Sequence, residues 1–160
     1  MVRWAAPALL MLVVAAALFL FVDRGGPASP GPEVKVILVA GPGRVLADST
    51  GEALFIYQPD DRGPSRCVTA CATAWPPLLL PAGDRYPVAG RGVDPSLLGT
   101  TRRHDGSLQV TYNRWPLYLD RDYTQGPRTG QGDGMGAWYL ISPDGSVDRQ
   151  PIDEASDVGA

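Results

Sequence analysis

Cys67-Val68-Thr69-Ala70-Cys71-Ala72-Thr73-Ala74-Trp75-Pro76-Pro77 holds both cysteines of the chain and one of its four tryptophans. The cysteines are four residues apart, so on one helical turn they share a face at a separation compatible with a disulfide. The double proline ends any helix there, because proline lacks an N–H and restricts the residue before it. Leu-aromatic pairs lie on either side, at Leu54-Phe55 and Leu117-Tyr118. This arrangement predicts a short helical unit between two β units.

The composition favours β structure. Glycine (19) and proline (16) exceed a fifth of the 160 residues and divide the chain into short runs. Branched and aromatic residues predict one hairpin from 44–48 and 52–57, and a second from 107–113 and 115–119 with a tight turn at Asn113-Arg114. The two hairpins form a weak internal repeat, in which Val45–Asp48 corresponds to Val110–Asn113. The expected fold is mainly β, with two degenerate β-hairpin repeats and the short helical Cys-x-x-x-Cys segment between them, followed by a further strand at 135–142.

The N-terminus predicts membrane targeting. Residues 4–22 carry no charge and would extend roughly 28 Å as a helix, close to the thickness of a bilayer core. We expect residues 1–24 to be an uncleaved signal-anchor, with a cleaved signal peptide as the alternative. Arg3 before the span favours a cytoplasmic N-terminus and an extracytoplasmic remainder. A Pro/Gly linker (25–32), the β repeat domain (33–152) and a disordered tail (153–160) should follow.

The charge of the chain argues against nucleic acid as a partner. Beyond residue 24 there are 12 basic and 16 acidic residues, with no basic stripe of the kind that contacts phosphates. Arg102-Arg103 is the only basic doublet, and we expect it to lie on a solvated face.

Several blocks resemble a family of secreted repeats of unknown function, also described as predicted lipoproteins with a Y-x-[FWY]-x-x-D motif. The likeness covers roughly Val36 to Gly145 and implies an exported β domain, without implying an activity. Asp120 departs from it by replacing an aromatic residue, Thr69 stands where the family often has glycine, and no cysteine follows the apolar segment to accept a lipid. The residues that carry the family motif are Phe55, Tyr57, Asp60, Trp75, Pro76, Pro77, Gln109, Tyr112, Pro116, Leu117, Tyr118 and Trp138.

Two hypotheses remain for Cys67 and Cys71. In an oxidising compartment they would form a structural disulfide, with no metal or cofactor. Alternatively they would handle copper or exchange disulfides, with His104 as a further ligand, since thiolates suit Cu(I). The absence of a thioredoxin-like βαβ pattern favours the first hypothesis.

No catalytic pattern stands out. The carboxylates available are Asp60, Asp61, Asp120, Asp122 and Asp133, but aspartates between strands commonly bond their own backbone. No Gly-x-Ser-x-Gly elbow exists. An aromatic face would suit a glycan or an envelope protein, and its candidates are Tyr57, Tyr112, Trp115, Tyr118, Trp138 and Tyr139. The sequence therefore predicts a membrane-anchored or secreted, non-catalytic binding or envelope-associated module.

Overall fold

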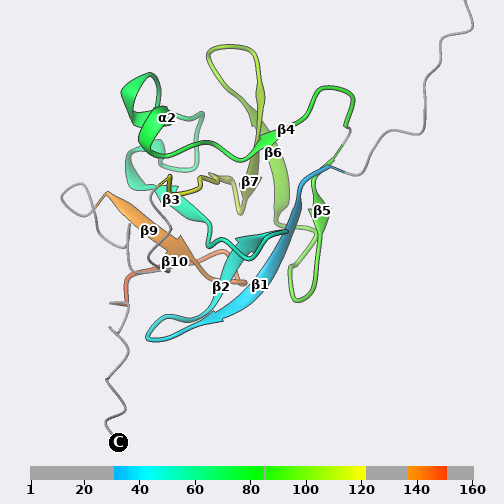
Figure 1. Cartoon of the computed structure of the whole chain (residues 1–160), viewed down its shortest axis with the longest axis vertical. Helices are drawn as coiled ribbons and strands as arrows, with labels where there is room; N and C mark the ends of the chain where they lie inside the picture. Colours follow the sequence, from blue (N-terminus) through cyan, green and yellow to red (C-terminus); the bar gives the residue numbers. More distant parts are fainter. Residues whose placement is uncertain (1–30, 85, 122–136, 151–160) are drawn as a thin grey trace, which may run out of the picture.

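The computed structural model describes residues 31–84, 86–121 and 137–150 (Figure 1). The predicted anchor (1–24), most of the linker and the tail lie outside these residues, as do Asp122 and Asp133. No helix in the described ranges is long and apolar enough to cross a bilayer. The elements are β1 (Glu33–Val39), β2 (Gly43–Asp48), β3 (Phe55–Tyr57), the 3-10 turn η2 (Gln58–Asp60), α2 (Ala70–Ala74), β4 (Leu79–Leu80), β5 (Val88–Ala89), β6 (Leu98–Arg102), β7 (Leu108–Tyr112), β8 (Trp115–Pro116), β9 (Trp138–Ile141) and β10 (Val147–Asp148).

In the described part of the chain the strands form three small sheets, and the short helix α2 lies at the edge of the domain (Figure 1), which confirms the mainly β class. Their orders are β2-β1-β5, β10-β9-β3 and β4-β7-β6, with β8 paired to β7. The second predicted hairpin is confirmed as β7–β8. Its two turn residues, Asn113 and Arg114, both have positive φ angles, 45° and 69°, as a two-residue hairpin turn of type I′ requires.

The first predicted hairpin is confirmed only next to its turn. β2 pairs with β1 along its whole length. It also meets the returning segment through an antiparallel Ala47–Ala53 bridge and two backbone hydrogen bonds of 2.9 Å, from Asp48 N–H to Glu52 O and from Leu54 N–H to Leu46 O. The Asp48 carboxylate fixes this turn, because its Oδ1 accepts the backbone N–H groups of Thr50, Gly51 and Glu52. Beyond Leu54 the predicted pairing ends, and β3 pairs with β9 instead.

The internal repeat is visible in the backbone hydrogen bonds. Leu54 N–H donates to Leu46 O at 2.9 Å, and Leu117 N–H donates to Val110 O at 3.0 Å. Leu46 therefore corresponds to Val110, one residue away from the correspondence expected from the sequence. The difference arises because the turn that follows β2 is one residue longer than the turn that follows β7.

The two repeats are interlocked rather than packed face to face. Phe55 and Tyr118 occupy equivalent places and exchange both backbone hydrogen bonds, each 2.9 Å long. Beyond this bridge, β3 of the first repeat pairs with β9 at the end of the second. Tyr118 of the second repeat in turn forms a bridge with Pro77 at the end of the first. Each repeat therefore completes its strand pairing with the terminal segment of the other.

The two tryptophans that end the repeats meet in the core. Trp75 and Trp138 stack with ring centroids 4.1 Å apart and planes 11° from parallel. Phe55 and Tyr118 contact this pair edge-on, at 5.3 Å from Trp75 and 5.1 Å from Trp138. Cys67 belongs to the same buried cluster, so the cysteine segment is fixed against the centre of the domain.

Candidate functional site

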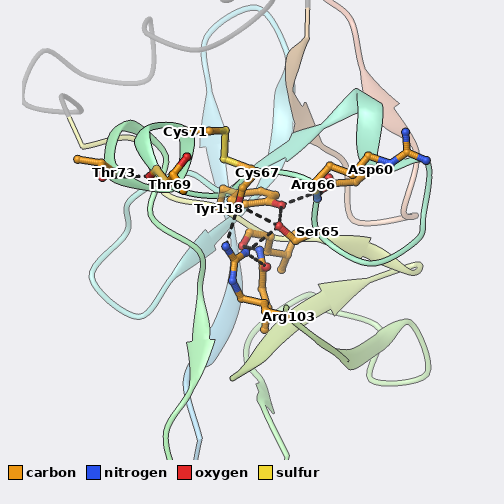
Figure 2. Close-up of a disulfide and its surroundings, with 11 residues drawn as sticks. Asp60, Ser65, Arg66, Cys67, Thr69, Cys71, Thr73, Arg103 and Tyr118 are labelled. Atoms are coloured by element: carbon orange, nitrogen blue, oxygen red, sulfur yellow. Dashed lines mark hydrogen bonds between the residues drawn. A yellow bond between two sulfur atoms is a disulfide. The ribbon is translucent and has the colours of Figure 1, made fainter. Parts of the chain in front are cut away.

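The structure contains the predicted disulfide. Cys67 and Cys71 are bonded, with their Cα atoms 5.2 Å apart. Cys67 is fully buried, whereas Cys71 is half-buried. α2 begins at Ala70, so Cys67 precedes the helix instead of sharing a helical turn with Cys71. The bond thus joins the start of α2 to the extended segment before it (Figure 2).

Thr69 lies inside the disulfide loop in a backbone conformation that disfavours its side chain. Its φ is 52° and its ψ is −121°, a combination that β-branched residues rarely adopt. Such a residue costs on the order of 1–3 kcal/mol. This position is the one at which the resembling family often has glycine, and the positive φ supplies the physical reason.

Arg103 connects the two repeats through three neutral acceptors. It is 7% exposed, and its Nη1 donates to Ser65 Oγ at 2.7 Å and to Gln109 Oε1. Its Nη2 donates to the Cys67 carbonyl at 2.7 Å, as Figure 2 shows. Gln109 continues the chain of hydrogen bonds by donating from Nε2 to the Leu117 carbonyl at 2.7 Å. The expectation of a solvated doublet is therefore wrong for Arg103, because these acceptors replace its water.

Asp60 and Tyr118 extend this network on its far side. The Tyr118 hydroxyl donates to Asp60 Oδ2 at 2.6 Å and lies 2.6 Å from Ser65 Oγ. Asp60 Oδ1 accepts the Arg66 backbone N–H at 2.7 Å. Burial raises the pKa of the Asp60 carboxyl above its usual value, although the bonds from Tyr118 and Arg66 and the charge of Arg103 oppose the rise. Burial and the neighbouring Asp60 likewise raise the pKa of Tyr118.

These residues come from both repeats. Asp60 and Ser65 belong to the first repeat, and Arg103, Gln109 and Tyr118 belong to the second. Sequence reasoning identified Asp60, Gln109 and Tyr118 as motif residues, but it missed Ser65 and assigned Arg103 to the surface. The spacing of 36 residues between Cys67 and Arg103 leaves no local signal by which their contact could be found.

The proposed copper ligand His104 lies at the surface, beside the disulfide loop. It is exposed and lines a hollow of about 250 Å³ with Thr69, Ala72 and Asp105. Within the described ranges, no group of three or more histidine, cysteine, aspartate or glutamate side chains is placed to hold a metal ion. Of the candidate carboxylates, Asp61 is exposed in a turn and Asp120 is buried.

The aromatic residues mostly fill the core. Tyr112, Trp115, Tyr118 and Trp138 are buried, and Tyr57 and Tyr139 are half-buried. Tyr57 stacks on Trp138, with ring centroids 4.5 Å apart. The residue equivalent to Tyr57 in the second repeat is Asp120, which has no ring to make such a contact. Tyr86, which is 77% exposed, was not among the candidates.

The segment from β6 to the end of β9 matches a known family. Residues 99–142 match a secreted repeat of unknown function. The expected resemblance is confirmed over this segment, which contains the second repeat with Gln109, Tyr118 and Trp138. No curated protein and no solved structure matches the chain. The secreted repeat and the disulfide agree on an extracytoplasmic domain, since disulfides persist in oxidising compartments.

Proposed function

We propose that this secreted-repeat protein is a non-catalytic binding or envelope-associated module, held at the outer face of the cytoplasmic membrane by residues 1–24. The observation that supports this function is that the central polar side chains are engaged in hydrogen bonds within the domain. Arg103, Ser65, Tyr118 and Asp60 bond one another and the backbone across the two repeats. Side chains bonded in this way stabilise a rigid scaffold. A catalytic centre would instead need an acid, a base or a nucleophile that is free to contact a substrate.

The cysteine pair has the same structural role in this proposal. Cys67 Sγ is bonded and buried, and the Cys67 carbonyl is held by Arg103. Breaking the disulfide would loosen the start of α2 and the placement of Trp75 in the core. The partner of the module would be an envelope protein or a glycan, bound on the outer surface of the domain.

The second candidate function is extracytoplasmic redox or copper handling by Cys67 and Cys71, with His104 nearby. One observation favours it: Cys71 is half-buried, and the hollow lined by His104 opens beside the disulfide loop at Thr69 and Ala72. Thiol exchange requires an accessible sulfur, and Cys71 is the more accessible of the two.

Intact-mass analysis of the full exported chain separates the two functions. The protein is measured native and denatured, with thiol alkylation before and after reduction. The structural role predicts a mass two hydrogen atoms below that of the dithiol form, alkylation only after denaturation and reduction, and no retained metal. Alkylation of the native protein after treatment with a mild reductant, or copper held until denaturation, would instead establish the cysteine pair as the working site. The His104→Ala variant serves as a control: under the second function it should lower copper retention, and under either function it should leave the disulfide mass unchanged.

A further inference from the structure

A hollow of about 280 Å³ opens between the loop that precedes the disulfide and the sheet formed by β6 and β7. The loop contributes Gly63 and Pro64 to its wall. Its polar side chains are two arginines and three threonines, namely Arg62, Arg114, Thr100, Thr101 and Thr111. None of the described residues that line this hollow is acidic, although the domain as a whole is acidic.

Neither arginine has a partner of opposite charge among the described residues. Within residues 31–84, 86–121 and 137–150, neither guanidinium makes a hydrogen bond or an ion pair. Arg62 lies over the ring of Trp115, 5.7 Å from its centroid, and Arg114 projects from the β7–β8 turn. An aromatic face of this kind positions a guanidinium and leaves its N–H edge free to donate.

Both arginines also occupy left-handed backbone positions. Their φ angles are 57° for Arg62 and 69° for Arg114. Glycine or asparagine adopts this conformation with less strain, and the second place of a type I′ turn usually holds glycine. Two arginines at such positions, both lining one hollow, indicate that the side chains serve a purpose other than stability.

Thr111 supplies an unused hydroxyl in the same hollow. It is 6% exposed, and its side chain makes no hydrogen bond to the described part of the chain. Gly99 lies opposite on β6, and a Cβ at Gly99 would come within 3.1 Å of Thr111 Oγ1. The absence of a side chain at Gly99 therefore keeps this hydroxyl uncovered.

The loop wall of the hollow is held rigidly. Gly63 N–H donates to the Asp60 carbonyl at 2.8 Å, and Asp60 also accepts Arg66 N–H and Tyr118 O–H. On the other side of Pro64, Ser65 is bonded to Arg103. Arg62 is thus carried by a loop that is fixed at both ends, which lowers the cost of ordering it around a ligand.

We infer that this hollow binds an oxyanion group, a phosphate or a carboxylate carried by a hydroxyl-rich molecule. Two guanidinium groups match the paired oxygens of such anions, and their charge-assisted hydrogen bonds are roughly twice as strong as neutral ones. Threonine hydroxyls complete the donor set. The inference rests on the proposed binding function and names the chemistry of its ligand.

The test is an NMR titration of the full chain in detergent micelles with sodium phosphate and, separately, sodium glucuronate, at constant ionic strength. The expected result is saturable shifts of the Gly63, Thr101 and Thr111 amide signals. Arg62→Asn and Arg114→Gly should each weaken binding by about tenfold or more, as expected for loss of a charge-assisted contact. Both replacements suit the left-handed backbone, so the variants should stay folded.

Arg44→Gln is the matched control, because it removes one exposed positive charge on β2 away from the hollow, and it should retain the wild-type affinity. Tighter binding of phosphate than of glucuronate would assign the ligand to phosphate esters, and the reverse order would assign it to acidic sugars. The inference is overturned if neither anion gives a saturable response, or if the Arg62→Asn/Arg114→Gly double variant binds as the wild type does. These outcomes are independent of the mass analysis, so failure of the oxyanion site is distinct from failure of the structural role of the disulfide.

Discussion

Replacement of Arg103 by methionine should destabilise the domain far more than the same replacement of its neighbour Arg102. Arg103 is 7% exposed and donates to Ser65, Gln109 and the Cys67 carbonyl. Arg102 is exposed and donates once, to the Gly106 carbonyl at 2.8 Å. The two variants remove the same charge from adjacent residues, so they isolate the effect of the buried network.

The magnitude follows from the bonds that are lost. Hydrogen bonds to a charged group contribute roughly 1.5–3 kcal/mol each, and Arg103 makes three of them. The loss of free energy should be smaller than the sum of the three bonds, because contributions that share one side chain are not additive, and because Ser65 Oγ can still donate to the Cys67 carbonyl at 3.3 Å. We therefore expect Arg103→Met to lower the free energy of unfolding by about 3 kcal/mol. Arg102→Met should change it by no more than about 0.5 kcal/mol, as surface substitutions usually do.

Urea denaturation of the full chain under non-reducing conditions, followed by tryptophan fluorescence, measures both values. Trp75 and Trp138 stack in the core next to the network, so their emission reports its loss. If Arg103→Met and Arg102→Met unfold at the same urea concentration, then the buried guanidinium does not connect the repeats energetically, and the assignment of the network as the structural centre is refuted.

Thr69→Gly should raise the free energy of unfolding by about 1 kcal/mol, because the positive φ favours glycine; an equal gain in Thr69→Ala would contradict this cause. The double variant Cys67→Ser/Cys71→Ser should stay folded, and its free energy of unfolding in urea should fall by about 2 kcal/mol, since closing a short loop removes little chain entropy. Loss of the fold would show that the disulfide does more than fix the start of α2. Burial raises the pKa of Asp60 above its usual 3.8 in the folded state, so its stabilising contribution is complete below pH 3.8 and declines as pH rises through the folded pKa. The free energy of unfolding of the wild type minus that of Asp60→Asn should accordingly decrease as the pH is raised. A difference that grows with pH would show that the bonds from Tyr118 and Arg66 outweigh burial.

The sequence by itself determined the features that depend on neighbouring residues. Abundant glycine and proline predicted short strands, and Asn113-Arg114 predicted the turn between β7 and β8, because these preferences act within a few residues. The four-residue spacing of Cys67 and Cys71 made their disulfide geometrically accessible for the same reason.

Only the tertiary structure decided which strands pair and which polar residues are buried. β3 has the pattern of a returning hairpin strand, yet it pairs with β9, because a strand edge offers the same backbone groups to any partner. The pairing of the returning segment with β2 ends at Leu54, and the terminal segment of the other repeat then pairs with β3. Arg103 is indistinguishable from Arg102 by composition, and its burial depends on Ser65, Gln109 and the Cys67 carbonyl arriving together from distant segments. The free energy of a buried guanidinium is set by those acceptors, which only the folded chain brings to it.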